Sequence, residues 1–203
     1  MAKQIGCRVT GISLSEKQVG QATALAQSEN VAHLANFERK DYNSTGFPDG
    51  SFDVVWAIES VCYAKDKADF LREAFRLLKK GGRLIVTDFF KKDNLTGTDA
   101  KQVERWAHGW AIDDYATEEA FVQKSTEAGF TNIEVQNASA AIMPSAKRLY
   151  RAYFLGIVPA FLYRLFNRNH TALAKNNVDT AYLQYVTLKK NLWKYLIVSA
   201  EKG

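Results

Sequence analysis

Cysteine and long hydrophobic runs are the features that this sequence has least of. Its 203 residues include only Cys7 and Cys62 as cysteines, too few for a disulfide framework or a zinc site. We expect two free thiols, as in a reducing cytoplasm, and no metal, because no metal-ligating cluster stands in the sequence. The longest apolar stretch, Ala152 to Tyr163, is too short to span a bilayer. No signal peptide is expected, since residues 1–7 hold no apolar run.

Acidic residues are scarce in the last quarter of the chain. Residues 145–203 contain 10 Lys+Arg and 2 Asp+Glu, whereas residues 1–144 contain 17 and 20. This basic excess suits an anionic substrate, a membrane surface or nucleic acid, and it is equally consistent with a solvated face. No nucleic-acid partner is expected, because Phe, Tyr and Leu dominate the segment and its lysines form no run.

Short apolar runs alternate with helical patterns along the chain. This rhythm predicts an α/β fold with a largely parallel sheet, in a single domain. The expected strands are residues 7–13, 33–41, 52–58, 83–90, 130–138 and 192–200. A helix that Thr117 caps and Gly129 ends is expected before the fifth of them.

Two earlier helices are also predicted from their ends. Ser15 suits an N-cap, and Gln18 stands three residues on, at the capping-box position. A second helix is expected to start at Asp66, with an apolar face directed at the core. Lys79-Lys80 would lie in its last turn, where cations complement the helix dipole, and Gly81-Gly82 would end it.

Four segments follow one another in an order typical of one enzyme family. They are VTGISLSEKQ, KDYNSTGFPDGSFDVVWAIES, FLREAFRLLKKGGRLIVTDFF and YATEEAFVQKSTEAGFTNIEV. Together they resemble the class I S-adenosylmethionine-dependent methyltransferases. The first is most similar to the branch of cyclopropane-fatty-acid synthases, sterol and tocopherol methyltransferases and small-molecule O-methyltransferases. The resemblance implies a Rossmann-like sheet with helical cap insertions, S-adenosyl-L-methionine as cofactor and a small-molecule substrate.

One signature of this family has no counterpart in the sequence. The family's first strand ends in a loop of the form E/D-x-G-x-G, whose glycines let backbone N–H groups approach the cofactor. Nothing of that form precedes Cys7. We therefore expect a domain that lacks its first strand and this loop, with strand edges that favour a homo-oligomer. A catalytically inactive fragment or scaffold subunit is the alternative to an active enzyme.

The resemblance assigns cofactor contacts to the ends of several strands. Ser13 and Gln18 would contact the ribose or adenine, and Leu14 would lie against the adenine ring. Asp41 would accept from the adenine amino group, while the Tyr42 backbone N–H donates to a ring nitrogen. A plain helix cap at Gln18 and an ordinary loop aspartate are the competing interpretations. The expected cofactor-binding residues are Gly11, Ile12, Ser13, Leu14, Gln18, Lys40, Asp41, Tyr42, Ala57 and Ile58.

Candidates for the chemistry follow the strand at residues 52–58, because ligands of open α/β sheets bind beyond the carboxyl ends of strands. A carboxylate such as Glu59, emerging from an apolar strand, is costly unless it is paired or used. It would orient a hydroxyl, act as a base or steady a cation, or else be a buried glutamate bonded to backbone. Tyr63 is a second candidate. His108, expected in a loop before Thr117, is a distant candidate base or a solvated loop residue.

Two insertions, at about residues 91–116 and 144–190, are expected to cover the strand ends. Pro159 is expected to break or kink the helix of the second one. This segment forms either an apolar lid for a lipid- or isoprenoid-like acceptor, with peripheral membrane contact, or a cap packing on its own core. Its prominent residues are Arg148, Tyr150, Arg151, Tyr153, Phe154, Phe161, Tyr163, Arg164, Phe166 and Arg168.

Overall fold

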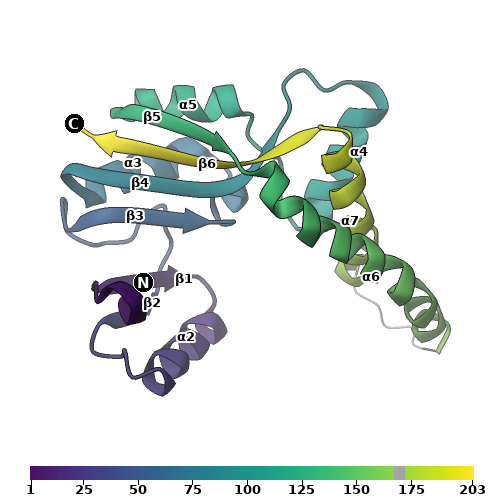
Figure 1. Ribbon diagram of the computed structural model, residues 1–203, viewed down its shortest axis with the longest axis horizontal. Coiled ribbons are helices and arrows are strands. Elements are labelled where there is room, and N and C mark those ends of the chain that lie inside the picture. The colour runs from purple at the N-terminus through teal and green to yellow at the C-terminus, as the bar shows by residue number, and fades with distance from the viewer. Residues whose placement is uncertain (167–171) are drawn as a thin grey trace. The chain divides into compact units, whose positions relative to one another are not determined.

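The structure is a computed structural model that describes residues 1–166 and 172–203 (Figure 1). Within these ranges, side chains are described outside residues 156–178. The chain forms two compact units, Met1–Pro48 and Asp49–Gly203. Each unit is treated by itself below.

The first unit is a small α/β element built on two parallel strands. It contains α1 (Ala2–Ile5), β1 (Val9–Ser13), α2 (Glu16–Ser28) and β2 (Ala35–Arg39). β1 and β2 pair in parallel, in a register that sets Gly11 opposite Phe37. A Cβ on Gly11 would approach the Phe37 ring to 2.6 Å, so this position needs glycine for packing.

The second unit contains a four-stranded sheet in the order β3-β4-β6-β5. Its strands are β3 (Phe52–Ile58), β4 (Leu78–Lys91), β5 (Phe130–Asn137) and β6 (Trp193–Lys202). β3 and β4 are parallel, whereas β6 runs antiparallel to both β4 and β5. The sheet is therefore mixed: β3, β4 and β5 run in one direction, as expected for a largely parallel sheet, and β6 runs against them.

The antiparallel return of β6 follows from the helices that precede it. α6 (Ser139–Phe166) begins just after β5, and α7 (Ala172–Lys189) ends just before β6. The two helices pack side by side beyond one end of the sheet (Figure 1). An antiparallel helix pair returns the chain to the same end of the sheet at which β5 finished. β6 must therefore run in the opposite direction to β5.

The helix α3 (Lys67–Leu77) is shorter than predicted. Its N-cap is Asp66, as expected, and its inward face buries the apolar side chains. Lys79 and Lys80 lie in β4 rather than in the last helical turn, so that prediction is wrong. Instead, the Lys202 ammonium donates hydrogen bonds to the carbonyls of Phe75 and Leu78 at 2.7 and 2.8 Å. β6 brings this cation to the end of the helix.

Two helices pack together on one face of the sheet, α3 and α5 (Glu118–Glu127) (Figure 1). The Thr117 hydroxyl caps α5 by accepting from the Ala120 N–H at 3.2 Å. Gly129 follows the helix with φ of 101°, as its predicted role at the helix end requires. Phe121 of α5 packs edge-on against Phe90 of β4, with ring centroids 5.3 Å apart.

The helices expected to cap the strand ends are α4 (Gly97–Gly109), α6 and α7. α6 begins five residues before Pro144 and continues through Pro159, so the proline does not end it. The core beneath these helices is aromatic: Trp106 stacks on Trp193 at 4.5 Å and on Tyr115 at 4.4 Å. In the described part of the chain, no helix is long and apolar enough to cross a membrane.

Asp66→Ala is expected to lower the free energy of unfolding by about 1 kcal/mol, the usual cost of losing an N-cap. The Asp66 carboxylate accepts from the Ala68 N–H at 2.9 Å and lies 3.0 Å from Lys124. These contacts, the backbone bond foremost, lower the pKa of Asp66. The stabilisation is therefore complete above the ordinary Asp pKa of about 4 and is lost as the pH falls through the lowered value.

Urea unfolding at neutral pH and at about pH 3 measures both effects. The difference between wild type and variant should shrink at the lower pH. Asp69→Ala is the control, because its exposed pair with Arg72 is worth at most about 1 kcal/mol. An equal loss in both variants, with no pH dependence at Asp66, would contradict the capping role.

Candidate functional site

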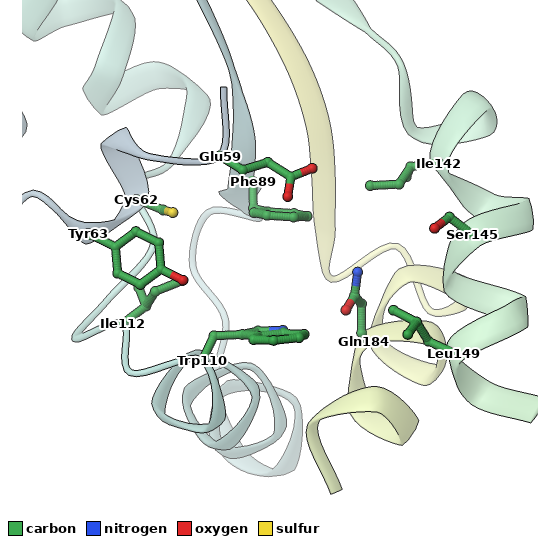
Figure 2. A pocket seen from close by; sticks show the side chains of 10 residues that line it. All are labelled: Glu59, Cys62, Tyr63, Phe89, Trp110, Ile112, Ile142, Ser145, Leu149 and Gln184. Carbon is green, nitrogen blue, oxygen red and sulfur yellow. The ribbon is translucent and has the colours of Figure 1, made fainter. Parts of the chain in front are cut away.

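The second unit contains a cavity of about 240 Å³ at the carboxyl ends of β3 and β4 (Figure 2). Its walls come from the segment after β3, from β4, from the turn after α4, and from the cap helices α6 and α7. The lining residues are Glu59, Cys62, Tyr63, Phe89, Trp110, Ile112, Ile142, Ser145, Leu149 and Gln184. Three aromatic rings and four aliphatic or sulfur-bearing side chains make this cavity largely apolar.

Glu59 brings a carboxylate into this apolar surrounding. Its backbone has φ of 47°, a left-handed conformation that costs a non-glycine residue energy and is concentrated at functional sites. The Glu59 N–H donates to the Thr87 carbonyl at 2.8 Å, and Glu59 Oε1 accepts from the Tyr195 hydroxyl at 2.8 Å. Burial, followed by this bond, raises the pKa of Tyr195, so tyrosine remains a donor.

The predicted alternative for Glu59, a buried glutamate bonded to backbone, is wrong. Glu59 is exposed and its side chain bonds another side chain. The turn after β3 explains this outcome, because the left-handed backbone carries the side chain out of the sheet and toward the cavity (Figure 2).

A second carboxylate, Asp88, lies beneath the cavity. It is 1% exposed, and its two oxygens accept from the Cys62 and Phe89 N–H groups, each at 2.9 Å. Burial raises the pKa of Asp88, and it also raises the pKa of the Cys62 thiol, with Asp88 adding to the effect. Asp88 thus anchors the short helix η1 (Val61–Tyr63), and Cys62 is a protonated lining group rather than a nucleophile.

Eight of the predicted cofactor-binding residues lie in the first unit, along β1, at the start of α2 and just after β2. Parallel neighbours end at the same edge, so the Lys40 N–H donates to the Ser13 carbonyl at 3.2 Å. The Ser13 hydroxyl donates to Gln18 Oε1 at 2.6 Å. This set is Gly11, Ile12, Ser13, Leu14, Gln18, Lys40, Asp41 and Tyr42. Their role toward a cofactor stays a prediction.

Only one of the two hydrogen bonds of the predicted capping box is present. The Ser15 hydroxyl accepts from the Gln18 N–H at 3.3 Å, as a cap should. The Gln18 side chain does not return to the Ser15 N–H, which instead donates to the Ser13 hydroxyl at 3.1 Å. Gln18 and Ser13 therefore present a joined amide and hydroxyl just after β1.

The loop after β2 holds a polar group without a partner. Asp41 Oδ1 accepts from the Asn43 N–H at 2.8 Å, which closes an Asx turn. The Asn43 Oδ1 atom is buried and has no hydrogen bond in the described structure. Asn43 was not among the predicted residues, and its acceptor lies beside Asp41, the predicted acceptor for adenine. Lys40 is less available, since its ammonium donates to the Thr45 carbonyl at 2.7 Å.

The remaining predicted residues have mixed outcomes. Tyr63 lines the cavity with Glu59, as expected. His108 lies in the last turn of α4, not in a loop, and is exposed. It does not line the cavity, because Trp106 and Ala107 occupy the inward face of that helix. Of the two residues predicted at the end of β3, Ala57 is buried and Ile58 is exposed.

Three residues in or next to the cavity have no counterpart among the predictions: Asp88, Gln184 and Tyr195. Asp88 could have been found by the argument applied to Glu59, since it too interrupts an apolar strand. Tyr195 and Gln184 could not, because they come from β6 and α7, more than 120 residues after Glu59, and no local pattern joins them. The aromatic residues singled out on α6, Tyr150 and Tyr153, pack with Tyr182 and Tyr185 of α7.

The helix α6 contributes side chains both to the core between the helices and to the cavity, and its role as a lid for a lipid-like acceptor stays a prediction. Tyr150 and Tyr153 belong to the core between the helices, whereas Ile142, Ser145 and Leu149 of α6 line the cavity. The side chains of Phe161, Tyr163, Arg164, Phe166 and Arg168 lie outside the described residues.

Comparisons with known proteins agree with this architecture. Residues 1–86 match the family described as "Methyltransferase domain". The chain is 34% identical over 142 residues to 2-methyl-6-phytyl-1,4-hydroquinone methyltransferase of Synechocystis sp., covering 68% of this chain and 44% of that protein. It is 42% identical over 100 residues to 27-O-demethylrifamycin SV methyltransferase of Amycolatopsis mediterranei, covering 49% and 37%.

A solved structure shows the same fold. Geranyl diphosphate C-methyltransferase from Streptomyces coelicolor superposes with a TM-score of 0.74 at 16% identity, covering 100% of this chain and 66% of that one. The chain spans less than half the length of the two curated relatives above. It belongs to the class I S-adenosylmethionine-dependent methyltransferases, in the branch that includes tocopherol, sterol and quinone methyltransferases.

The two cysteines are expected to differ sharply in reactivity. Each unit by which a thiol pKa rises lowers the thiolate fraction about ten-fold, and Cys62 is also buried. A disulfide reagent such as Ellman's should label one thiol of the native chain rapidly and Cys62 at least about ten-fold more slowly. The Cys7→Ser variant should then show only the slow phase until urea is added. Rapid labelling of Cys62 in that variant would contradict the described burial.

Proposed function

We propose that the protein transfers a methyl group from S-adenosyl-L-methionine to a carbon or oxygen of a small, largely apolar metabolite. The observation that carries the proposal is the aromatic-walled cavity with one carboxylate, Glu59, held in place by Tyr195. Family membership supports the cofactor. A dry, shaped cavity suits the reaction, because positioning and exclusion of water supply most of the rate of such a transfer.

The residues of the first unit fit the adenosine part of this cofactor. Leu14 offers an exposed apolar side chain, and the Ser13–Gln18 pair offers a hydroxyl and an amide. The unpaired Asn43 oxygen adds an acceptor next to Asp41. The cofactor, when bound, supplies an activated methyl group on its sulfonium. The protein therefore has to bind and orient the cofactor and the acceptor and does not have to activate the methyl group.

Glu59 is the proposed catalytic residue of the second unit. Its Oε1 atom accepts from Tyr195, and no described residue donates to its Oε2 atom. That oxygen is free to accept a hydrogen bond from an acceptor hydroxyl, to take its proton, or to balance a positive charge that develops on carbon. Tyr63, Phe89 and Trp110 form the apolar walls that would hold the acceptor body.

The names of relatives support an apolar acceptor. One relative is named for 2-methyl-6-phytyl-1,4-hydroquinone and another for 27-O-demethylrifamycin SV. The first name contains a hydroquinone, an aromatic ring with two hydroxyl groups, and an aromatic-walled cavity suits such a ring. The second name indicates an oxygen as the methylated atom.

We also propose that α6 contacts a membrane surface while an apolar acceptor enters. Phe154 and Leu155 are 52% and 80% exposed, and the basic side chains of Arg148 and Arg151 are exposed on the same helix. Apolar side chains next to cations are typical of helices that bind anionic lipid surfaces.

Glu59→Gln is expected to lower the rate of methyl transfer at least about 100-fold, in the range for loss of a positioned acid–base group. The assay uses labelled S-adenosyl-L-methionine with 2-methyl-6-phytyl-1,4-hydroquinone as acceptor. Calorimetry with S-adenosylhomocysteine should give the same affinity for both proteins. A parallel fall in cofactor affinity would move Glu59 to the cofactor side, and unchanged turnover would leave it only a structural role.

Asp41→Ala is expected to weaken S-adenosylhomocysteine binding by about 1–3 kcal/mol, the cost of leaving a buried partner unsatisfied. Calorimetry on the native chain and the variant measures this change. Asp49→Ala is the control, because Asp49 lies in the other unit and its exposed carboxylate pairs with Arg76. Equal affinity in the native chain and Asp41→Ala would exclude the adenine contact.

A further inference from the structure

The amide of Gln184 is a buried polar group that the proposed chemistry does not use. Gln184 lies on α7, is 5% exposed and lines the cavity that contains Glu59. Its Oε1 atom has no hydrogen-bond partner in the described structure. Figure 2 shows the amide pointing from α7 into the cavity, whereas Glu59 enters it from the end of β3.

Two other buried polar side chains nearby, Thr187 and Asp88, have partners. Thr187, one turn further along α7, donates to the Leu183 carbonyl at 2.6 Å and accepts from Trp193 Nε1 at 2.9 Å. Asp88 is satisfied by two backbone N–H groups. A buried amide oxygen without a hydrogen bond lowers the free energy of unfolding, so Gln184 is unfavourable for the stability of this chain alone.

We propose that Gln184 is a specificity residue that hydrogen-bonds an O–H or N–H group of the methyl acceptor. The proposal rests on the proposed function, since it names what that acceptor must carry. The acceptor is then an apolar ring or chain with a hydrogen-bond donor on the part that faces α7, distinct from the group that meets Glu59.

The chemistry of the amide supports this assignment. Glutamine offers an acceptor and two donors, and rotation about its last torsion exchanges the oxygen and nitrogen at little cost. A ligand hydroxyl satisfies either atom, whereas a hydrocarbon or a bulky ether leaves the amide oxygen unpaired. Sites with a buried polar group reject analogues that lack the matching hydroxyl far more strongly than apolar pockets reject a missing methylene.

A purely structural role for Gln184 has a specific form. Trp106 Nε1 and the Tyr115 hydroxyl are also buried, with no partner among the described residues, and both belong to the core against which α7 packs. If the Gln184 amide served these donors in solution, its removal would destabilise the fold. If it serves the acceptor, its replacement by an apolar side chain of the same length leaves stability unchanged or higher.

The test compares two probes on the native chain and the variant Gln184→Met. The probes are 4-propylphenol, which has an apolar body and an O–H donor, and 4-propylanisole, which lacks the donor. Binding is followed by calorimetry without cofactor. We expect the variant to bind the phenol about ten-fold more weakly, as for one lost buried hydrogen bond. The affinity for the anisole should stay within about two-fold in the same comparison.

Gln123→Met is the matched control, because Gln123 is exposed on α5 and bonds only Glu127 in the described structure. It should leave both affinities unchanged. An equal loss for both probes in Gln184→Met, or a lower midpoint of thermal unfolding with the phenol preference intact, would overturn the proposal. Methyl transfer that shows no dependence on Gln184 would also overturn it while the proposed function stands. Phenol discrimination without methyl transfer would refute the proposed function and leave the binding role supported.

Discussion

The pairing of β6 between β4 and β5 is the interaction on which the second unit depends. β6 is near the end of the chain, yet it is an inner strand of the sheet, between β4 and β5. Trp193 packs on Trp106 of α4, and the Tyr195 hydroxyl donates to Glu59. The Lys202 ammonium donates to the Phe75 carbonyl near the end of α3. One strand therefore joins the cap, the candidate catalytic carboxylate and the helix behind the sheet. The site cannot form before this last strand has paired.

The two carboxylates of this site are held by hydrogen bonds. Asp88 accepts from two backbone N–H groups, an arrangement that fixes the turn after β3. That turn places Glu59 in its left-handed conformation and directs the carboxylate into the cavity. The Glu59 carboxylate itself is held by the Tyr195 hydroxyl, a donor on the inner strand β6. A methyl acceptor would thus meet a carboxylate positioned by a second side chain in a mainly apolar space.

The sequence predicted the local features of this fold well and the long-range ones poorly. The strand at Phe52–Ile58 and the caps at Ser15, Asp66 and Thr117 follow from patterns within a few positions. The antiparallel β6, the partner Tyr195 and the wall residue Gln184 depend on contacts across more than 100 residues, which periodicity and capping do not encode. His108 was expected in a loop but lies in α4, for a related reason. The buried Trp106 determines which face of α4 points inward, and Trp106 packs on residues that are distant in the sequence.

The division of the cavity along the chain indicates where acceptor choice resides. The family match covers residues 1–86, which include Glu59, Cys62 and Tyr63. The other seven lining residues come from later positions, on β4, after α4, and on α6 and α7. Methyl transfer needs little from side chains beyond orientation, so the early segment can serve many reactions, and most of the cavity wall that a new acceptor would meet comes from the later segment. Sequence similarity over the early segment therefore identifies the chemistry of the family, while the acceptor has to be determined from the cavity.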